Sequence, residues 1–533
     1  MKNIGRYIVL SMLSLAQVAC SDFLKEDSGD LLIPKKVDEF APVLYGEGYP
    51  SSLNDDLAWF GLMTDDIEMG PLELDPKADG AEDRDDNIFN SLDGGEGRQA
   101  YVWHYNIEDK IMDDFWAKRY DNILACNIVI DALPGMEYVE ADSGKYNYLA
   151  AQAYALRAYH YWCLANTYAA PYAEANLDKP GVIIRLDPQI DIAPHRRSSV
   201  RETWQQINED IKVAERYVEV SEISGNKHLL TKPAIYFLAS RIALFQENWE
   251  EVIRTGNLFW ELNNTVFDLN SVERSAMGTD KTDGFTMMDG SLNGEIVFTF
   301  GTSASSYSYD YLCTPSGGTF YGLGFRASYS DENSLIQSYE EGDLRKLAWF
   351  LQDIPAEEEE FWGQIFYTPA EYFYNYPIKY RKMGTGEGPN AKLYRENWRS
   401  TEVILNMAEA YARRDDRVSQ DAIDWLNRLR KGRIETAKYV DKVISDFSGK
   451  EDLVKFIWAE RRRELCFEEA MRFWDLRRQG MPQLVHKWYS SATMYEIYVL
   501  RQGSPNYVLA IPDSEINYND LCTDNPREVI NNQ

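Results

Sequence analysis

Apolar side chains recur at helical spacing through most of the chain, which indicates a mainly α-helical protein. The pattern predicts long helices that pair with their neighbours in the sequence. Because one helix pair cannot bury its own apolar face, we expect the pairs to stack and share a core, as tetratricopeptide-like repeats do. No clean period of about 34 residues is present. The predicted pairs are 107–133 with 147–168, 200–219 with 232–246, and 400–413 with 419–431.

The strongest helical pattern lies between residues 397 and 480. Its first two helices are separated by the polar run 413–416, which predicts a helical hairpin. The sequence after this hairpin, LVKFIWAERRRELCFEEAMRFWDLRRQG, predicts one long charged helix. The last two predicted pairs of the chain carry alanine at small-residue positions with an aromatic residue nearby, which is a pattern typical of helical repeats.

Three carboxylates on one face of the charged helix, Glu460, Glu464 and Glu468, allow two interpretations. They could form a metal or acid–base site, or they could pair with arginines of the same helix. We favour local ion pairs, because functional carboxylates would need partners on other elements. The neighbouring arginines are Arg461, Arg462, Arg463, Arg472, Arg477 and Arg478.

Two segments lack helical periodicity. Residues 65–100 predict a long acidic loop, and a loop of that length in a compact domain is usually functional. Its run DPKADGAEDRDD could suggest Ca²⁺, but it lacks the register of an EF-hand, so a solvated surface is the favoured interpretation. In residues 262–396, Gly, Ser, Thr and Asn clusters separate short runs, and residues 295–300 (EIVFTF) predict a strand.

The N-terminus has the pattern of a secretion signal. A basic start with Lys2 and Arg6 precedes a mainly apolar stretch of twelve residues, 7–18, which is too short to span a bilayer. Val18-Ala19-Cys20 then fits a bacterial lipoprotein cleavage box, which predicts a lipid-modified Cys20 and an anchored chain. The alternative is ordinary secretion, with Cys20 at that position by chance.

The helical stretch between residues 397 and 480 also resembles a known family. An AEAY run, then AIDWLNRLR, then ERRRELCFE with RFWDLRRQG, is similar to the C-terminal signature of SusD/RagB-type nutrient-uptake lipoproteins. Residues 110–260 resemble the same family clearly and residues 262–396 weakly. The resemblance implies a helical-repeat scaffold with a loop-rich part, a place on the outer surface of the outer membrane, and a SusC-like TonB-dependent transporter as partner.

The expected organisation follows from these patterns. It comprises a lipoprotein signal peptide (1–19), a lipidated tether (20–36), an N-terminal helical part (37–261), a loop-rich ligand-binding part with short strands (262–396) and a C-terminal helical part of the same domain (397–533).

Composition narrows the range of functions. The formal charge of −31 argues against nucleic-acid binding, which needs a basic surface. The sequence contains no HExxH, GxSxG, P-loop or GxGxxG motif, and five histidines leave little for catalysis or metal binding, so we expect no enzyme, cofactor or metal. No cysteines form a CxxC pair, and Cys126, Cys163 and Cys466 are expected to be small buried residues.

Aromatic residues in loops are the remaining candidates for function. Flat rings beside polar groups suit the apolar faces and hydroxyl rims of sugars. For any single ring, burial in the core is the favoured alternative. The ligand-binding candidates are Phe89, Trp103, Tyr307, Tyr309, Tyr311, Phe320, Tyr321 and Trp362.

The combined hypothesis is a non-enzymatic glycan-binding lipoprotein that captures a saccharide and delivers it to the transporter. The alternatives are an oligopeptide-binding member of the same family, a repeat scaffold that binds only proteins and, less favoured, a surface glycosidase. The glycosidase would need two carboxyls at a fixed separation across a cleft, and nothing in the sequence points to such a pair.

Overall fold

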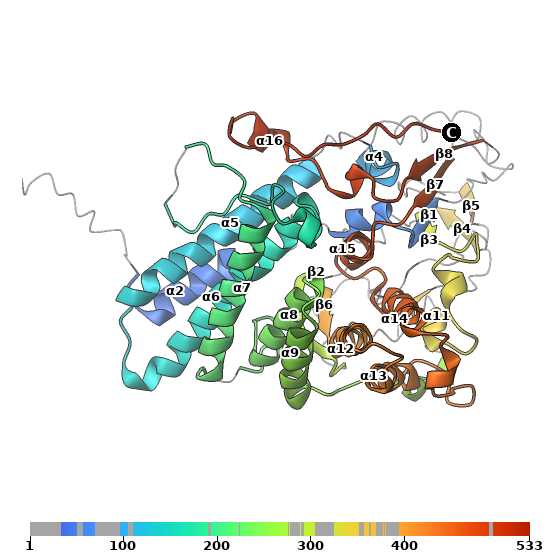
Figure 1. Cartoon of the computed structure of the whole chain (residues 1–533), viewed down its shortest axis with the longest axis horizontal. Coiled ribbons are helices and arrows are strands. Elements are labelled where there is room, and N and C mark those ends of the chain that lie inside the picture. Colours follow the sequence, from blue (N-terminus) through green and yellow to red (C-terminus); the bar gives the residue numbers. More distant parts are fainter. Residues whose placement is uncertain are drawn as a thin grey trace, which may run out of the picture.

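The computed structural model describes most of the chain. The described residues are 34–50, 57–69, 96–104, 110–189, 193–222, 224–274, 277, 288, 293–303, 325–350, 357–361, 364–368, 377, 379, 394–489 and 494–533. The protein is mainly helical, as the sequence predicts (Figure 1).

The N-terminal part contains the helices expected from its pattern. A short helix and a π-helical turn open it, and long helices follow; one of these, α6, is buried along almost all of its length from Tyr148 to Tyr168. The elements are α2 (Val37–Val43), η1 (Leu44–Gly48), η2 (Leu57–Met63), α4 (Glu96–Tyr101), α5 (Lys110–Ala132), α6 (Ser143–Tyr168), α7 (Val200–Glu219), α8 (Lys232–Phe245) and α9 (Trp249–Leu262).

The loop-rich part contains one further described helix, α11 (Leu344–Trp349). The C-terminal part contains α12 (Ser400–Arg414), α13 (Gln420–Lys431), α14 (Lys450–Leu465), α15 (Met471–Arg478) and α16 (Asp513–Ile516). Short 3-10 turns connect elements throughout: η3 (Leu133–Gly135), η4 (Glu140–Asp142), η5 (Glu174–Asn176), η6 (Leu269–Ser271), η8 (Ile336–Ser338), η10 (Ile444–Asp446) and η11 (Pro505–Tyr507).

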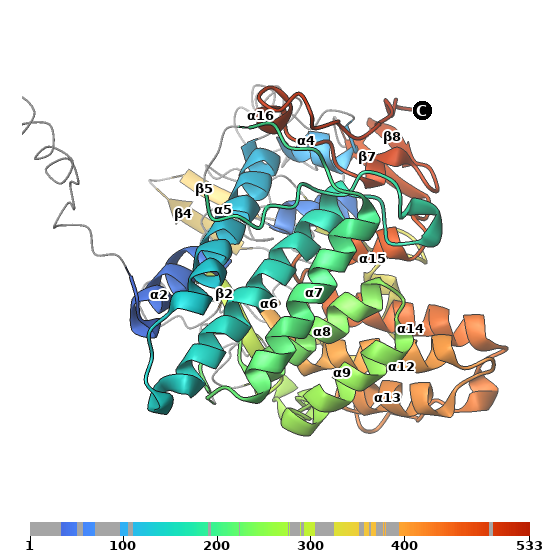
Figure 2. The same cartoon turned by 60° about the vertical axis from the view of Figure 1, so that its left-hand side comes forward.

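Successive long helices lie next to one another in one array (Figure 2). The contacts run from α5 to α6, α7, α8, α9 and α12, and α12 then packs against both α13 and α14. Two of the predicted pairs, α5 with α6 and α12 with α13, are confirmed. The array buries a continuous core, which is the arrangement that lets individually amphipathic helices share apolar surface.

The predicted pairing of 200–219 with 232–246 is wrong. Helix α7 packs mainly along α6, and α8 packs mainly against α9. Only residues 246–248 connect α8 to α9, whereas residues 220–231 connect α7 to α8. Short connections make consecutive helices antiparallel neighbours, so the tighter turn decides the pair.

The predicted long charged helix is also wrong, because it breaks into α14 and α15 around residues 466–470. Phe467 and Glu469 have positive φ angles of 62° and 45° in this turn. Such angles are costly for residues other than glycine and persist where surrounding contacts hold them in place. The following subsection describes those contacts.

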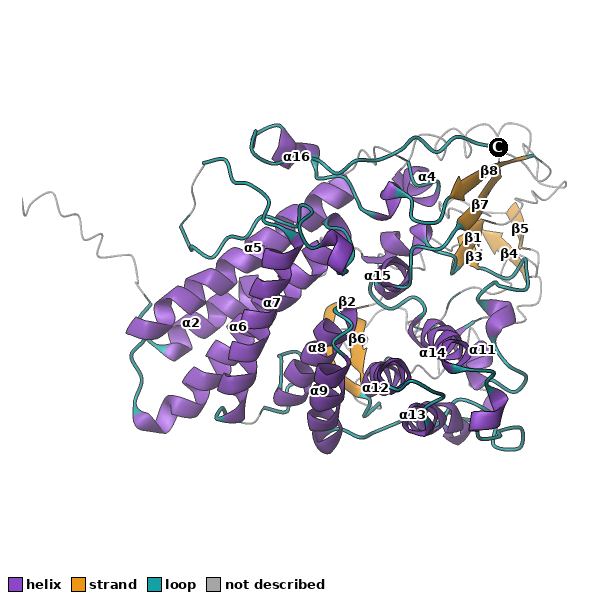
Figure 3. Ribbon diagram, in the orientation of Figure 1, coloured by secondary structure: helices purple, strands orange, loops and turns teal. Residues whose placement is uncertain are grey.

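The described strands pair in antiparallel two-stranded sheets (Figure 3). The predicted strand over 295–300 is confirmed as part of β2, which lies beside α8 and carries Phe298 against Trp398 of its partner strand at 4.8 Å. The sheets are β2 (Ile296–Ser303) with β6 (Tyr394–Arg399), β1 (Ile67–Met69) with β3 (Phe325–Ala327), β4 (Glu357–Phe361) with β5 (Gln364–Thr368), and β7 (Leu484–Tyr489) with β8 (Tyr495–Leu500).

The prediction for three cysteines is confirmed. Cys126, Cys163 and Cys466 carry thiols and are fully buried, and Cys522 is buried as well. Burial raises the pKa of the Cys466 thiol to about 11, so it stays protonated and acts as a small apolar residue.

Candidate ligand face and its buried ion-pair support

Two segments that carry candidate aromatic residues join the described structure at one small sheet. Segment 70–95 follows Met69, the last residue of β1, and segment 304–324 ends at Phe325, the first residue of β3. In the sheet, Met69 lies directly opposite Phe325. The two segments therefore meet the folded body at adjacent positions, although they lie far apart in the sequence.

Most of the predicted site lies outside the described residues. Its residues stay predictions: Phe89, Tyr307, Tyr309, Tyr311, Phe320, Tyr321 and Trp362, together with the lipidation candidate Cys20. The acidic run considered for Ca²⁺ lies outside the described residues too.

Trp103 is the one candidate ring that the structure describes, and its placement corrects the expectation. The side chain is fully buried, and its indole Nε1–H donates to the Met63 carbonyl oxygen at 3.0 Å. One ring face stacks on His486 with the centroids 4.1 Å apart. Trp103 therefore has no exposed face for a ligand and acts as a core residue, the alternative weighed for every single ring.

His486 of β7 lies between two aromatic rings and fastens this core. Its ring stacks on Tyr101 as well as on Trp103. Its nitrogens lie 2.7 Å from the Tyr101 carbonyl oxygen and 2.9 Å from that of Thr64. A neutral imidazole can donate only one of these hydrogen bonds. Burial nevertheless lowers the pKa of His486 to about 4, so desolvation outweighs the second bond and the ring is neutral at pH 7.

Two adjacent aspartates fix the start of β1 to the C-terminal helices. Asp65 accepts two hydrogen bonds from Arg472 of α15, each 2.8 Å long, and Asp66 accepts one from Arg462 of α14 at 2.6 Å. Burial raises the pKa of Asp65, but the charges of Arg462 and Arg472 outweigh burial and lower it overall. The sheet from which both candidate segments leave is therefore held by charge-assisted bonds.

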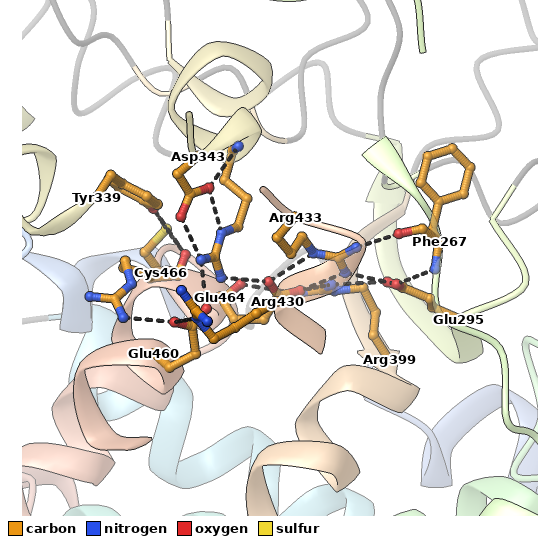
Figure 4. A network of polar contacts seen from close by, with 12 residues as sticks. Phe267, Glu295, Tyr339, Asp343, Arg399, Arg430, Arg433, Glu460, Glu464 and Cys466 are labelled. Atoms are coloured by element: carbon orange, nitrogen blue, oxygen red, sulfur yellow. Dashed lines mark hydrogen bonds and ion pairs between the residues drawn. The ribbon is translucent and has the colours of Figure 1, made fainter. Parts of the chain in front are cut away.

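Glu464 of α14 is the centre of a buried ion network (Figure 4). Its carboxylate accepts hydrogen bonds from Arg345 at 3.0 Å, from Arg399 at 2.6 Å and from Arg433 at 2.9 and 3.0 Å. All four side chains are completely buried. Burial alone would raise the pKa of Glu464, but Arg433 and Arg399 outweigh it and hold the pKa well below the usual value.

The network continues on both sides of Glu464. Glu295, the residue before β2, accepts from Arg399 at 3.1 Å and from Arg433 at 2.7 Å. Glu460, one helical turn before Glu464, pairs with Arg345 at 2.6 Å and Arg463 at 2.7 Å. The network therefore joins α11, β6, the start of β2 and the end of α13 to one face of α14.

The structure corrects the partners predicted for these carboxylates. Glu460 does pair with Arg463 of its own helix, as the favoured interpretation expected. The arginines of Glu464, in contrast, lie 31 to 119 residues away in the sequence. Ion pairing is the right explanation, but most of it is long-range, and spacing along one helix carries no information about such partners.

The turn between α14 and α15 extends the network in two directions. Glu468 pairs with Arg399 and with Lys379 Nζ at 2.6 Å, and that amine also donates to the Glu464 and Cys466 carbonyl oxygens. Glu469 pairs with Arg241 of α8 at 2.8 Å. These contacts hold the positive φ angles of the turn and tie the loop-rich part to the N-terminal helices.

The charges in this network do not suit acid–base catalysis. A general acid needs a pKa near the working pH, whereas the arginines, acting against burial, lower the pKa of Glu460 to about 2. Within the described ranges, no group of three or more His, Cys, Asp and Glu side chains could hold a metal ion. The arrangement suits a rigid support, since removing one member would leave buried charges unpaired.

Sequence reasoning missed most residues of the buried ion network, and it missed the hairpin β7–β8. Glu295, Arg399 and Arg433 were not singled out, because a charged residue at the edge of a strand or helix gives no sign of its long-range partner. The hairpin β7–β8 was missed as well, although LVHKWY and YEIYVL carry the β-branched and aromatic residues typical of strands.

None of the described helices has both the length and the apolar character that crossing a membrane requires. This finding concerns the described ranges only.

Comparisons with known proteins agree with the resemblance noted in the sequence. A family model described as starch-binding associating with outer membrane matches residues 73–244, and a SusD family model matches residues 363–527. The SusD-like protein P2 of Formosa agariphila is 24% identical over 411 residues, which cover 72% of this chain and 75% of that protein.

Solved structures share the fold. A SusD superfamily protein from Bacteroides thetaiotaomicron matches with a TM-score of 0.66 at 18% identity, covering 92% of this chain and 100% of that one. A laminarin binding SusD-like protein matches with a TM-score of 0.60 at 17% identity, covering 93% and 100%. At these identities the likeness shows the fold alone.

Proposed function

We propose a function from one premise: the chain belongs to the SusD/RagB family. The protein is a non-enzymatic glycan-binding lipoprotein of the outer membrane. It captures an oligosaccharide or polysaccharide at the cell surface and passes it to a SusC-like TonB-dependent transporter. The family supports saccharide binding, and a structural relative is named for binding laminarin.

The observation that carries this proposal is the joining of both candidate segments to one supported sheet. β1 and β3 hold the ends of segments 70–95 and 304–324 side by side, and Asp65 and Asp66 fix that sheet to α14 and α15. Binding sites keep their affinity when the elements that carry them are held in place beforehand. A rigid base for segments that carry candidate aromatic residues is what a capture protein needs.

The position of α2 fits an anchored chain. α2 lies at one end of the molecule in Figure 1, and the sheets β1–β3 and β7–β8 lie at the other end. The chain enters the body next to α2, where Glu137 N–H donates to the Lys35 carbonyl oxygen at 2.7 Å. A lipid on Cys20 would therefore anchor the chain through a tether that enters the body beside α2.

A panel of polysaccharides tests the ligand class. The full chain is run in native gels that contain laminarin, starch, xylan or alginate, and the best binder is then titrated by calorimetry. Retardation by at least one polysaccharide is expected, with no reducing ends released after prolonged incubation. Binding of oligopeptides in place of every glycan would favour the peptide-binding alternative, and release of reducing ends would overturn the non-enzymatic function.

The anchor and the partner need separate tests. Cys20→Ala is expected to move the protein from the membrane fraction to the soluble fraction, and continued membrane association would contradict the lipid anchor. Purification of the tagged wild-type protein from detergent-solubilised outer membranes is expected to recover a TonB-dependent transporter. Recovery of the protein alone under the same conditions would contradict the partnership.

A further inference from the structure

The outward face of the hairpin β7–β8 has an unusual composition for a surface. Residues directly opposite in the register share a face, and the inward pairs are Leu484 with Leu500, His486 with Tyr498 and Trp488 with Glu496. In a sheet with one buried face, the other face is normally polar. Here the outward pairs are Val485 with Val499, Lys487 with Ile497 and Tyr489 with Tyr495.

The outward residues range from exposed to half-buried, and Tyr489 is half-buried because it also packs against the core. Val485 is 53% exposed and Tyr495 47% exposed, and Met494 beside them is 62% exposed. The rings of Tyr489 and Tyr495 lie 5.3 Å apart, and the amine of Lys487 lies 5.1 Å from the centre of the Tyr495 ring. Covering the exposed side chains of this face with a ligand would be favourable, because it would remove their apolar surface from water.

The backbone groups at the edges of the hairpin are less available to a ligand than the side chains of its outward face. The Tyr489 N–H at the end of β7 donates to Met69 Sδ at 3.4 Å, and the Ile497 carbonyl oxygen of β8 accepts from the Gln533 N–H at 3.0 Å. Strand addition by a peptide requires a free row of edge groups. A ligand would therefore lie on the side chains of the outward face.

The area of the outward face indicates which kind of ligand it can bind. Six residues per strand extend roughly 20 Å, and two strands lie about 5 Å apart, so the face offers on the order of 200 Å². A stable protein partner needs about 800 Å² on each side. A chain of a few sugar rings needs far less, and tyrosine rings with an amine beside them provide the apolar area and the hydrogen-bond donors that a sugar uses.

The hairpin packs against the separate two-stranded sheet β1–β3, from which the proposed ligand segments leave. β1 packs against β7, and its last residue, Met69, contacts Tyr489. Segment 70–95 begins directly after Met69, and segment 304–324 ends opposite it at Phe325. The described residues Met69 and Phe325, which adjoin these segments in the sequence, therefore lie beside the hairpin.

We propose that Tyr489, Tyr495 and Lys487 on the outward face of β7–β8 form an additional saccharide-binding platform. This inference rests on the proposed glycan-binding function and adds a subsite made of described residues. The tyrosine rings contact the apolar faces of sugar units, and the Lys487 amine donates to sugar hydroxyls or carboxylates. The aliphatic residues of the same face widen the contact.

Single variants on the hairpin test the platform with the polysaccharide that binds best among laminarin, starch, xylan and alginate. Tyr495→Ala is expected to weaken its affinity about three- to ten-fold, the range for loss of one aromatic contact. Lys487→Ala is expected to weaken an anionic polysaccharide such as alginate more than a neutral one. The matched control is Tyr138→Ala, because Tyr138 is also 47% exposed but belongs to the connection between α5 and α6. In both views that connection lies far from the hairpin.

The outcomes separate this inference from the proposed function. If the wild-type protein binds no glycan, the proposed function fails and the platform fails with it. If the wild type binds but Tyr495→Ala and Lys487→Ala bind equally well, the function stands and the platform is overturned. Equal losses in Tyr138→Ala and Tyr495→Ala would also overturn it, because the effect would not belong to the hairpin.

A footprinting experiment on the wild-type chain tests the platform without a substitution that could alter the fold. Acetylation of Lys487 and radical oxidation of Tyr495 and Met494 are followed by mass spectrometry with and without the best-binding polysaccharide. Protection of these residues is expected, whereas Lys438, an exposed lysine in the loop after α13, serves as the unprotected reference. Unchanged modification of Lys487 and Tyr495 at saturating ligand would contradict the platform.

Discussion

The ion network around Glu464 and the outward face of β7–β8 invert the usual distribution of residues in opposite ways. The network places charged groups in the interior, where apolar residues are normal, and the hairpin places apolar residues on the surface. Each inversion costs free energy unless something compensates for it. In the network, the compensation is visible as ion pairs and hydrogen bonds.

The hairpin face has no comparable compensation among the described residues, and this difference is instructive. An interior charge that is fully paired is explained by structure alone. An exposed apolar row that the fold leaves uncovered is better explained by a binding partner. The two regions should therefore respond differently to substitution: the network through stability, and the hairpin through ligand affinity.

The largest effect is expected for Glu464→Gln. The substitution keeps the shape but removes the charge that Arg345, Arg399 and Arg433 share, and it turns an amide group toward their donors. Removing one partner of a buried ion pair costs about 3–5 kcal/mol. Denaturant or thermal unfolding of the purified chain should show this loss.

The matched control for the network is Glu251→Gln on α9. Glu251 also pairs with an arginine, Arg254, but that arginine is 43% exposed. A solvent-exposed pair contributes about 1 kcal/mol or less. Equal destabilisation by both substitutions would contradict the special role of the buried network.

A second effect concerns the pH dependence of stability through His486. Its folded pKa of about 4 lies below the ordinary value of 6.5, so the unfolded chain binds the proton more readily between these values. The stability that this neutral histidine contributes is complete above about pH 6.5 and falls as the pH drops toward 4. The difference corresponds to about 3 kcal/mol at most.

The variant His486→Gln removes this titration. Its free energy of unfolding should be lower than that of the wild type at pH 7 and should fall less steeply between pH 6.5 and 4. His160 remains in both proteins, and burial also lowers its pKa, so the comparison isolates His486. Identical slopes for the two proteins in that window would contradict the assignment.

A smaller effect is expected for Trp103→Phe. The variant keeps an aromatic ring next to His486 but loses the hydrogen bond to the Met63 carbonyl oxygen, which leaves a buried acceptor unsatisfied. The cost in unfolding free energy should be about 1–2 kcal/mol. Glycan affinity should not change, because the ring is fully buried; a loss of affinity without loss of stability would restore Trp103 as a ligand residue.

Local patterns in the sequence predicted much of the fold and little of the site. Helical periodicity located the long helices closely, since apolar spacing reports which face is buried. It merged α14 and α15, because the positive φ angles of Phe467 and Glu469 depend on contacts with Arg241, Arg399 and Lys379. Periodicity indicates which positions are buried, but it does not indicate which charged residues far apart in the sequence form ion pairs.

Site prediction failed for a related reason. Trp103 and Tyr495 are both aromatic residues outside the long helices, yet one is fully buried and the other is 47% exposed. A sequence gives the chemistry of a ring but not whether other elements cover it. In the hairpin, apolar residues on both faces resemble a fully buried strand, so pattern reasoning alone would have placed Tyr495 inside.

The smallest expected effect on stability gives the sharpest test of the comparison between interior and surface. Val485→Thr on the outward face of β7 keeps a β-branched side chain of nearly the same shape and replaces one methyl group by a hydroxyl. At 53% exposure that hydroxyl stays hydrated, so the free energy of unfolding should change by less than about 0.5 kcal/mol.

The same substitution at Val297 of β2, which is 4% exposed, buries a hydroxyl and should cost about 1–3 kcal/mol. If the outward face serves a saccharide, Val485→Thr should still weaken glycan affinity about two-fold, because it removes apolar contact area. A hairpin that loses stability as β2 does, with affinity unchanged, would mean that another part of the chain covers this face and that its apolar residues belong to the core.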